Sequence, residues 1–271
     1  MCTVLLRWQP GATWPLLLGA VRDEFVDRPT DPPGRYWPDR PGVVGGRDRL
    51  GGGTWLALDP AGPAVAAVLN GPPLPGSDSP RPTRGILPLA ALSPRWVPPR
   101  AGELAHHDTF HLLLAGPAGA TVWSWDGAAL DVTVLRPGDH ILVNSGVDDG
   151  DDPLVPHVAP LLAGAGTVEP VPGPPTAAAW GDWYRLLRGD GLDPADPRAL
   201  LIGHTVGERR YASTSVTLVG LADPRGRRGL VRYDYTDRPF GTDGWREIPT
   251  AGPPAPALPP LPGSGRPVAP R

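Results

Sequence analysis

Proline and glycine are so frequent in this chain that they limit what it can fold into. They number 40 and 36, which is 28% of the 271 residues. A share this high is typical of low-complexity or disordered chains. The chain is nonetheless 40% hydrophobic, which is enough apolar material for a sizeable core. We therefore expect the prolines and glycines to gather in loops and in a tail.

The charged residues exclude several classes of protein. The formal net charge is −3, and all 25 basic residues are arginine. Without lysine the chain has no P-loop, no pyridoxal Schiff base and no Ser-x-x-Lys centre. A nucleic-acid-binding protein normally has a basic excess, and this chain has none. We predict a small molecule as the partner and no nucleic acid; the sequence leaves the oligomeric state open.

The single cysteine, Cys2, excludes an internal disulfide and a multi-cysteine zinc site. The N-terminus lacks a basic region followed by a long apolar stretch, so no signal peptide is predicted. No apolar run approaches the length of a membrane span. We expect a soluble, cytoplasmic protein with no membrane span.

The first two predicted strands form a hairpin that brings polar residues together. Thr3–Trp8 and Leu16–Val21 are apolar and β-branched, and a segment rich in turn residues separates them. In an antiparallel pair the start of one strand lies beside the end of the next. Cys2 should therefore lie next to Arg22 and Asp23.

Strands outnumber helices in the rest of the chain. Strands are predicted over Thr54–Asp59, Val65–Asn70, His111–Ala115, Val122–Trp125, Asp131–Leu135, His140–Asn144, Val216–Leu221 and Gly229–Tyr235. Helices are predicted over Gly85–Leu92, Pro153–Leu162 and Thr176–Leu187, and residues 27–53 are predicted as one long loop. Pro249–Arg271 has the composition of a disordered or polyproline tail. The prediction is an α+β domain of antiparallel sheets over residues 1–248.

Cys2 is the most informative residue for function. Removal of Met1 would leave a cysteine with a free α-amine, whose pKa is about 7.7–8.0. Such an amine can accept the thiol proton, so one residue would supply both nucleophile and base. Asp23 would orient the amine, and the Arg22 guanidinium would lower the pKa of the thiol. The simpler alternatives are that Cys2 is only a small residue, and that Arg22 and Asp23 form an ordinary ion pair.

A set of short motifs carries a family resemblance. They are Met1-Cys2-Thr3, Ala20-Val21-Arg22-Asp23-Glu24-Phe25, Asp27-Arg28-Pro29, Gly45-Gly46-Arg47-Asp48, Gly52-Gly53-Thr54-Trp55-Leu56, Leu69-Asn70, Thr83-Arg84-Gly85, Asp108-Thr109-Phe110-His111-Leu112-Leu113 and Val143-Asn144-Ser145-Gly146. Over about residues 1–235 the chain resembles the NRDE family, also called the transport and Golgi organisation protein 2 family.

The resemblance implies a four-layer αββα sandwich of the N-terminal-nucleophile (Ntn) hydrolase type, similar to choloylglycine hydrolases and penicillin V acylases. In that relation Cys2 is the nucleophile, with Arg22 and Asp23 as its partners. Asn70 and Asn144 are similar in placement to side chains that complete an oxyanion hole, where one donor contributes about 2.7–4 kcal/mol in other enzymes. The alternative for both is an asparagine that caps a turn.

Two positions depart from the family pattern. Val21 stands where the family has asparagine, and Thr214 stands where it has arginine. Arg47 is a candidate for binding an anionic substrate group, or it pairs with the neighbouring Asp48.

Histidines raise a separate possibility of ligand binding. His106, His107 and His111 lie close together in the sequence, and eukaryotic members of the family are linked to haem trafficking. Metal-binding histidines need a defined partner geometry, and we predict neither a metal nor a cofactor. The predicted function is hydrolysis of a linear amide bond of a small molecule. The alternatives are a non-catalytic carrier of haem or an acyl thioester, and a scaffold that binds partners through its Pro-rich tail.

Overall fold

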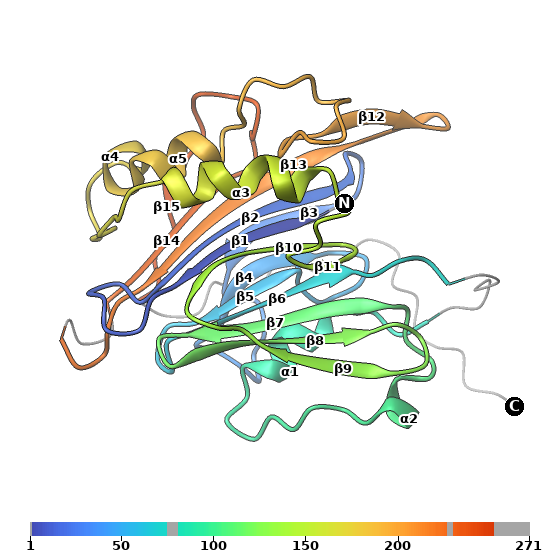
Figure 1. Cartoon of the computed structure of the whole chain (residues 1–271). Coiled ribbons are helices and arrows are strands. Elements are labelled where there is room, and N and C mark those ends of the chain that lie inside the picture. Colours follow the sequence, from blue (N-terminus) through green and yellow to red (C-terminus); the bar gives the residue numbers. More distant parts are fainter. Residues whose placement is uncertain (1, 75–80, 227–229, 252–271) are drawn as a thin grey trace, which may run out of the picture.

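The structure is a computed structural model, and it describes residues 2–74, 81–226 and 230–251. The described residues form two sheets in which every strand pair is antiparallel, together with a few short helices (Figure 1). This confirms the expected α+β chain rich in antiparallel sheet. Among the described residues, no helix has both the length and the apolar character needed to cross a membrane.

The first sheet contains both the first strand and the last strand of the described chain. Its strand order is β11-β10-β1-β2-β13-β14-β15, and β12 pairs with β13. The strands are β1 (Thr3–Trp8), β2 (Leu16–Phe25), β10 (Gly138–Val143), β11 (Gly146–Val147), β12 (Gly203–Val206), β13 (Arg209–Leu221), β14 (Val231–Thr236) and β15 (Arg246–Glu247). The second sheet follows the order of the sequence, with β3 (Thr30–Gly34), β4 (Val44–Asp48), β5 (Leu56–Asp59), β6 (Ala64–Asn70), β7 (Phe110–Gly116), β8 (Gly119–Trp125) and β9 (Leu130–Val134).

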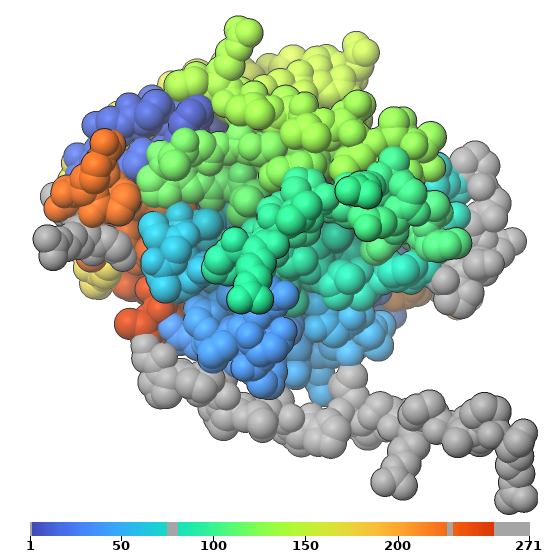
Figure 2. Space-filling model, turned by 90° about the horizontal axis from the view of Figure 1, so that it is seen from below, coloured from blue at the N-terminus to red at the C-terminus, as the bar shows by residue number. Residues whose placement is uncertain are grey.

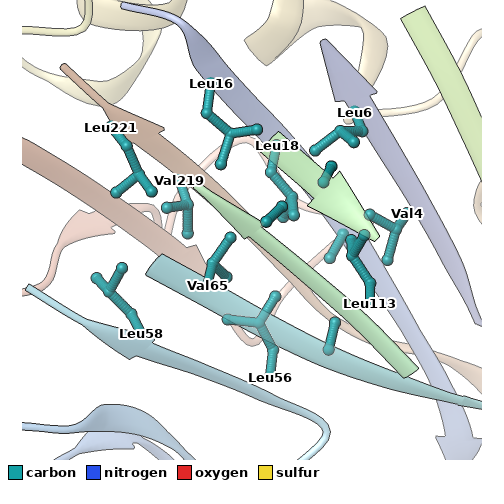
Figure 3. Close-up of a cluster of buried hydrophobic side chains, with 14 of the residues drawn as sticks. Val4, Leu6, Leu16, Leu18, Leu56, Leu58, Val65, Leu113, Val219 and Leu221 are labelled. Carbon is teal, nitrogen blue, oxygen red and sulfur yellow. The ribbon is translucent and has the colours of Figure 1, made fainter. Parts of the chain in front are cut away.

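Both faces of the first sheet are buried, which explains why its central strands are almost entirely apolar. In β2, Leu16 and Leu18 face the second sheet, whereas Leu17 lies in a separate cluster with the helices. Side chains alternate between the two faces of a strand, so a strand covered on both sides needs apolar residues at every position. Figure 3 shows the cluster between the sheets, where Leu56 and Val65 of the second sheet meet residues of the first.

Helices cover the outer faces of both sheets. The helices α3 (Leu154–Gly164), α4 (Thr176–Trp180) and α5 (Asp182–Leu186) lie over the first sheet. Trp180 of α4 and Trp183 of α5 are fully buried. The short helix α1 (Ile86–Ala91) lies over the second sheet, followed by α2 (Ala101–Leu104). Figure 2 views this second face, across which the teal-green residues of the α1–α2 region extend.

The structure departs from the sequence predictions at several places. The loop predicted over residues 27–53 is wrong, because it contains β3 and β4. β3 is an edge strand, the position in a sheet where prolines are tolerated. The helix predicted over Thr176–Leu187 is divided at Gly181, whose φ of 50° interrupts the helix. β12 was not predicted, and most of the predicted tail, residues 252–271, lies outside the described residues.

Candidate functional site

Cys2 lies directly before the start of β1, between two neighbouring strands. The registers Thr3–Val21 and Val4–Leu142 place Cys2 opposite Arg22 of β2 on one side and opposite Asn144, just after β10, on the other. The thiol faces the space between the sheets and packs against the central core. The hairpin prediction that Cys2 lies beside Arg22 and Asp23 is confirmed, since the Cys2 Sγ donates to the Asp23 backbone oxygen over 3.7 Å.

Asn144 holds the Cys2 nitrogen. The Cys2 N–H donates to Asn144 Oδ1 at 2.7 Å, and Asn144 Nδ2 donates to the backbone oxygen of Asn70 at 2.6 Å. Asn144 therefore links the first sheet to the end of β6 in the second. The Asn70 side chain lines the same cavity as Cys2 and makes no hydrogen bond to any described residue, so its amide N–H is available to a ligand.

His111 holds the backbone of Asn144 through a hydrogen bond. Its Nε2 lies 3.1 Å from the Asn144 backbone oxygen, and its Nδ1 lies 2.8 Å from Ser124 Oγ. A carbonyl only accepts, so Nε2 carries the proton and Nδ1 accepts from the Ser124 hydroxyl. Burial lowers the pKa of His111, which keeps the ring neutral. His111 thus has two protein partners, a positioning role that the sequence analysis did not identify.

Asp23 is a buried carboxyl group with hydroxyl partners. Ser213 Oγ donates to Asp23 Oδ1 at 2.6 Å, and the Tyr211 hydroxyl donates to the Asp23 backbone oxygen at 3.0 Å. Burial raises the pKa of Asp23 to about 7, against the lowering effects of the Ser213 hydrogen bond and the Arg22 charge. Burial also raises the pKa of the Cys2 thiol, and the Asp23 charge adds to that rise. The thiol is therefore protonated at rest.

Arg22 stacks on an aromatic ring from the second sheet. Its guanidinium carbon lies 4.4 Å from the centroid of Trp55, and its Nη1 donates to Thr214 Oγ1 at 3.1 Å. The expected effect of Arg22 on the thiol has the predicted direction, but burial and the Asp23 charge outweigh it. The predicted effect of Arg22 is therefore present, although the pKa of the thiol as a whole is raised.

The two departures from the family pattern occupy different surroundings. Thr214, in place of arginine, accepts the hydrogen bond from Arg22 and lies at a bulge between β13 and β2. Val21, in place of asparagine, is only 2% exposed and packs in the apolar cluster under the helices.

A cavity of about 580 Å³ opens above Cys2. Four predicted site residues line it: Cys2, Arg22, Asp23 and Asn70. Arg47 is not among the described residues that line it. The Arg47 guanidinium instead pairs with Asp31 at 2.7 Å and stacks over Tyr36, so the alternative pairing with Asp48 is wrong. A role for Arg47 in binding substrate stays a prediction.

The predicted histidine candidates do not gather into a site. His106 is exposed, and His111 is buried between its protein partners. Within residues 2–74, 81–226 and 230–251, no three histidine, cysteine or acidic side chains stand close enough to hold a metal ion.

Comparisons with known proteins give a family match and similar solved structures. No curated protein matches the chain. Among solved structures, penicillin V acylase from Agrobacterium tumefaciens is similar at 16% identity and a TM-score of 0.45, over 87% of this chain and 83% of that one. The Caenorhabditis elegans ortholog of N-acylethanolamine-hydrolyzing acid amidase is similar at 11% identity and a TM-score of 0.41, over 92% of this chain and 100% of that one. The family model described as Transport and Golgi organisation 2 matches residues 1–150, more than half of the sequence, so the chain belongs to that family.

Proposed function

We propose that this protein is an N-terminal-nucleophile hydrolase that cleaves a linear amide bond of a small molecule, with Cys2 as its nucleophile. One observation carries the proposal: the nitrogen and the sulfur of the same residue are both held at the cavity. Asn144 Oδ1 accepts from the nitrogen at 2.7 Å, and the thiol lies beside Asp23 and Arg22.

The protonated state of the thiol explains why a base is needed. Burial raises the pKa of the Cys2 thiol, so attack requires removal of the proton at the moment of reaction. After Met1 is removed the Cys2 nitrogen is a primary amine with a pKa of about 7.7–8.0, which is close to neutral pH and suits a general base. Asn144 and Asp23 orient this amine.

The reaction would proceed through a thioester. Cys2 Sγ bonds to the substrate carbonyl carbon while the α-amine takes the thiol proton. The carbonyl oxygen becomes an oxyanion, which accepts a hydrogen bond from Asn70 Nδ2. The α-ammonium then protonates the leaving nitrogen and the C–N bond breaks. Water, deprotonated by the same amine, attacks the thioester and releases the acid and the Cys2 thiol. In this mechanism Asn144 positions the amine instead of taking its predicted place in the oxyanion hole, because its Nδ2 already donates to the Asn70 backbone oxygen.

The arrangement of layers is compatible with this chemistry. We infer that the two sheets and the helices on their outer faces are the αββα sandwich of the Ntn hydrolases. The nucleophile proposed here precedes β1, and its side chain packs against the core between the two sheets.

Turnover of linear amides tests the proposal. Untagged protein is incubated with a panel of N-acylglycines from acetyl to decanoyl, and release of glycine is measured with an amine-reactive dye. Wild-type protein should turn over at least one member, and Cys2→Ala should lose that activity. Cys2→Ser, which keeps a weaker nucleophile, should retain a small fraction. Turnover that survives in Cys2→Ala, or no turnover by the wild type, would overturn the proposal; tight binding without turnover would favour the carrier alternative.

A further inference from the structure

The cavity around Cys2 is rich in arginine, and all but one of these arginines have an acidic partner. The paired arginines and their shortest N–O distances are Arg22 with Glu24 at 3.4 Å, Arg28 with Asp48 at 2.7 Å, Arg81 with Asp108 at 3.3 Å and Arg209 with Asp27 at 2.6 Å. Arg84 also lines the cavity, but forms no ion pair with any described residue. It is therefore the lining arginine whose charge is left for a ligand.

Arg84 is held rigidly in place. Its Nη1 donates to the Thr109 backbone oxygen at 2.9 Å. This bond leaves other N–H groups of the guanidinium without a hydrogen bond to any described residue. The adjacent backbone is fixed as well, because the Thr54 N–H donates to the Gly85 oxygen at 2.9 Å. Gly53 lies so close to Gly85 that a Cβ at Gly53 would stand 2.3 Å from the Gly85 carbonyl carbon.

The half-buried charge of Arg84 has a cost that a ligand would relieve. Burial lowers the pKa of Arg84, because the charged form loses hydration, and the nearby charges of Asp108 and Glu24 offset this only in part. Arg84 and Cys2 line the same cavity. An anionic group bound to Arg84 would therefore share that cavity with the thiol.

The charges nearby select the kind of anion. Glu24, Asp48 and Asp108 line the same cavity, and each already pairs with another arginine, so the charge of Arg84 is the one left over. A single remaining positive charge matches a singly charged anion better than a doubly charged phosphate. A carboxylate carries one charge and offers two oxygens in the plane of the guanidinium, the geometry that arginine prefers.

We propose that Arg84 binds a carboxylate of the ligand, so that the cavity takes amides bearing one carboxylate, such as N-acyl amino acids. This names the substrate class of the proposed hydrolase and rests on it for the reaction, although the binding step can be tested alone.

Binding to Cys2→Ala protein tests the inference without turnover. The probes are N-hexanoylglycine and N-hexanoylglycinamide, which are nearly the same size and differ in charge, and affinity is measured by calorimetry. The acid should bind at least ~10-fold more tightly than the amide, as expected for a charge-assisted hydrogen bond. The added substitution Arg84→Gln should abolish this preference.

The matched control is Arg81→Gln. Arg81 also lines the cavity and donates to a backbone oxygen, that of His107, but its charge is already paired. Arg81→Gln should keep the preference for the acid, and thermal unfolding checks that both variants are folded. Equal binding of the two probes, no binding of either, or a preference that survives Arg84→Gln would overturn the inference. Preferential binding of the acid without its turnover by the wild type would contradict the proposed hydrolase and leave the Arg84 assignment standing.

Discussion

At the scale of single residues, the site depends on a few hydrogen bonds to one nitrogen and one carboxyl group. Asn144 contributes an acceptor to the Cys2 nitrogen and a donor to the Asn70 oxygen, and His111 holds its backbone. These two functions of the Asn144 side chain are separable by substitution. The acceptor serves the proposed chemistry, whereas the donor joins the two sheets.

Asn144→Ala should lower kcat by ~10- to 100-fold, the effect of losing a hydrogen bond to a charged amine. KM should change little, because Asn144 is not among the residues that line the cavity. Asn144→Asp keeps an acceptor oxygen and should retain more activity than Asn144→Ala. Steady-state kinetics of the three proteins gives the comparison, and equal kcat in wild type and Asn144→Ala would contradict the positioning role.

The raised pKa of Asp23 predicts how stability changes with pH. The native carboxyl keeps its proton up to about pH 7, whereas in the unfolded chain it loses the proton near its ordinary value of 3.8. Between these values the native state binds more protons, so the free energy of unfolding falls as pH rises and stays at the lower level above pH 7. Asp23→Asn removes this titration and should flatten the fall.

Urea unfolding between pH 4 and 8 measures the effect, with the exposed Asp131→Asn as control. The control should follow the wild type. Parallel curves for wild type and Asp23→Asn would contradict the assignment of the raised pKa to Asp23.

At the scale of elements, hairpins between neighbouring strands could be predicted from the sequence, whereas contacts between segments far apart in the sequence could not. The register of β1 with β2 follows from one turn, so the neighbourhood of Cys2 and Asp23 could be predicted from sequence. The placement of Asn144 depends on β10 pairing with β1, more than 130 residues away along the chain. Arg84 reaches the cavity only because the segment before α1 lies against Gly53, and no periodicity in the sequence reports that contact.

Gly53→Ala tests the close contact between Gly53 and Gly85. The new Cβ would collide with the backbone of Gly85, so the Arg84 segment must move, at a cost of about 1–3 kcal/mol in the free energy of unfolding. The preference for N-hexanoylglycine over its amide should fall with it. Gly42→Ala is the control, since no atom lies within 4 Å of a Cβ placed there. Equal effects of the two substitutions on stability would contradict the account.

At the scale of the whole molecule, the two sheets share one core, and the described chain ends with contacts to both. Ile248 is buried, and its N–H donates to the backbone oxygen of Tyr233 at 2.7 Å. Arg35 Nη2 donates to the backbone oxygen of Thr250 at 2.6 Å. The succession of short strands joined by turns correctly predicted the antiparallel sheets. It did not predict which faces meet, because that depends on packing between strands distant in sequence.

Deletion of residues 252–271 should leave the fold intact. The contacts at Ile248 and Thr250 precede the cut, so the free energy of unfolding should change by less than about 0.5 kcal/mol, as for a surface change. A shorter chain that ends at Trp245 loses β15 and buried Ile248 and should be clearly less stable. Chemical denaturation of both truncations gives the comparison; a large loss in the first would contradict a domain over residues 1–248.

The intact mass of untagged, purified protein tests whether Cys2 acts with its own α-amine. The purified chain should start at Cys2 and be lighter than the full sequence by one methionine residue. A mass that includes Met1 would leave Cys2 with an amide nitrogen, which has no basic lone pair, and would contradict the mechanism.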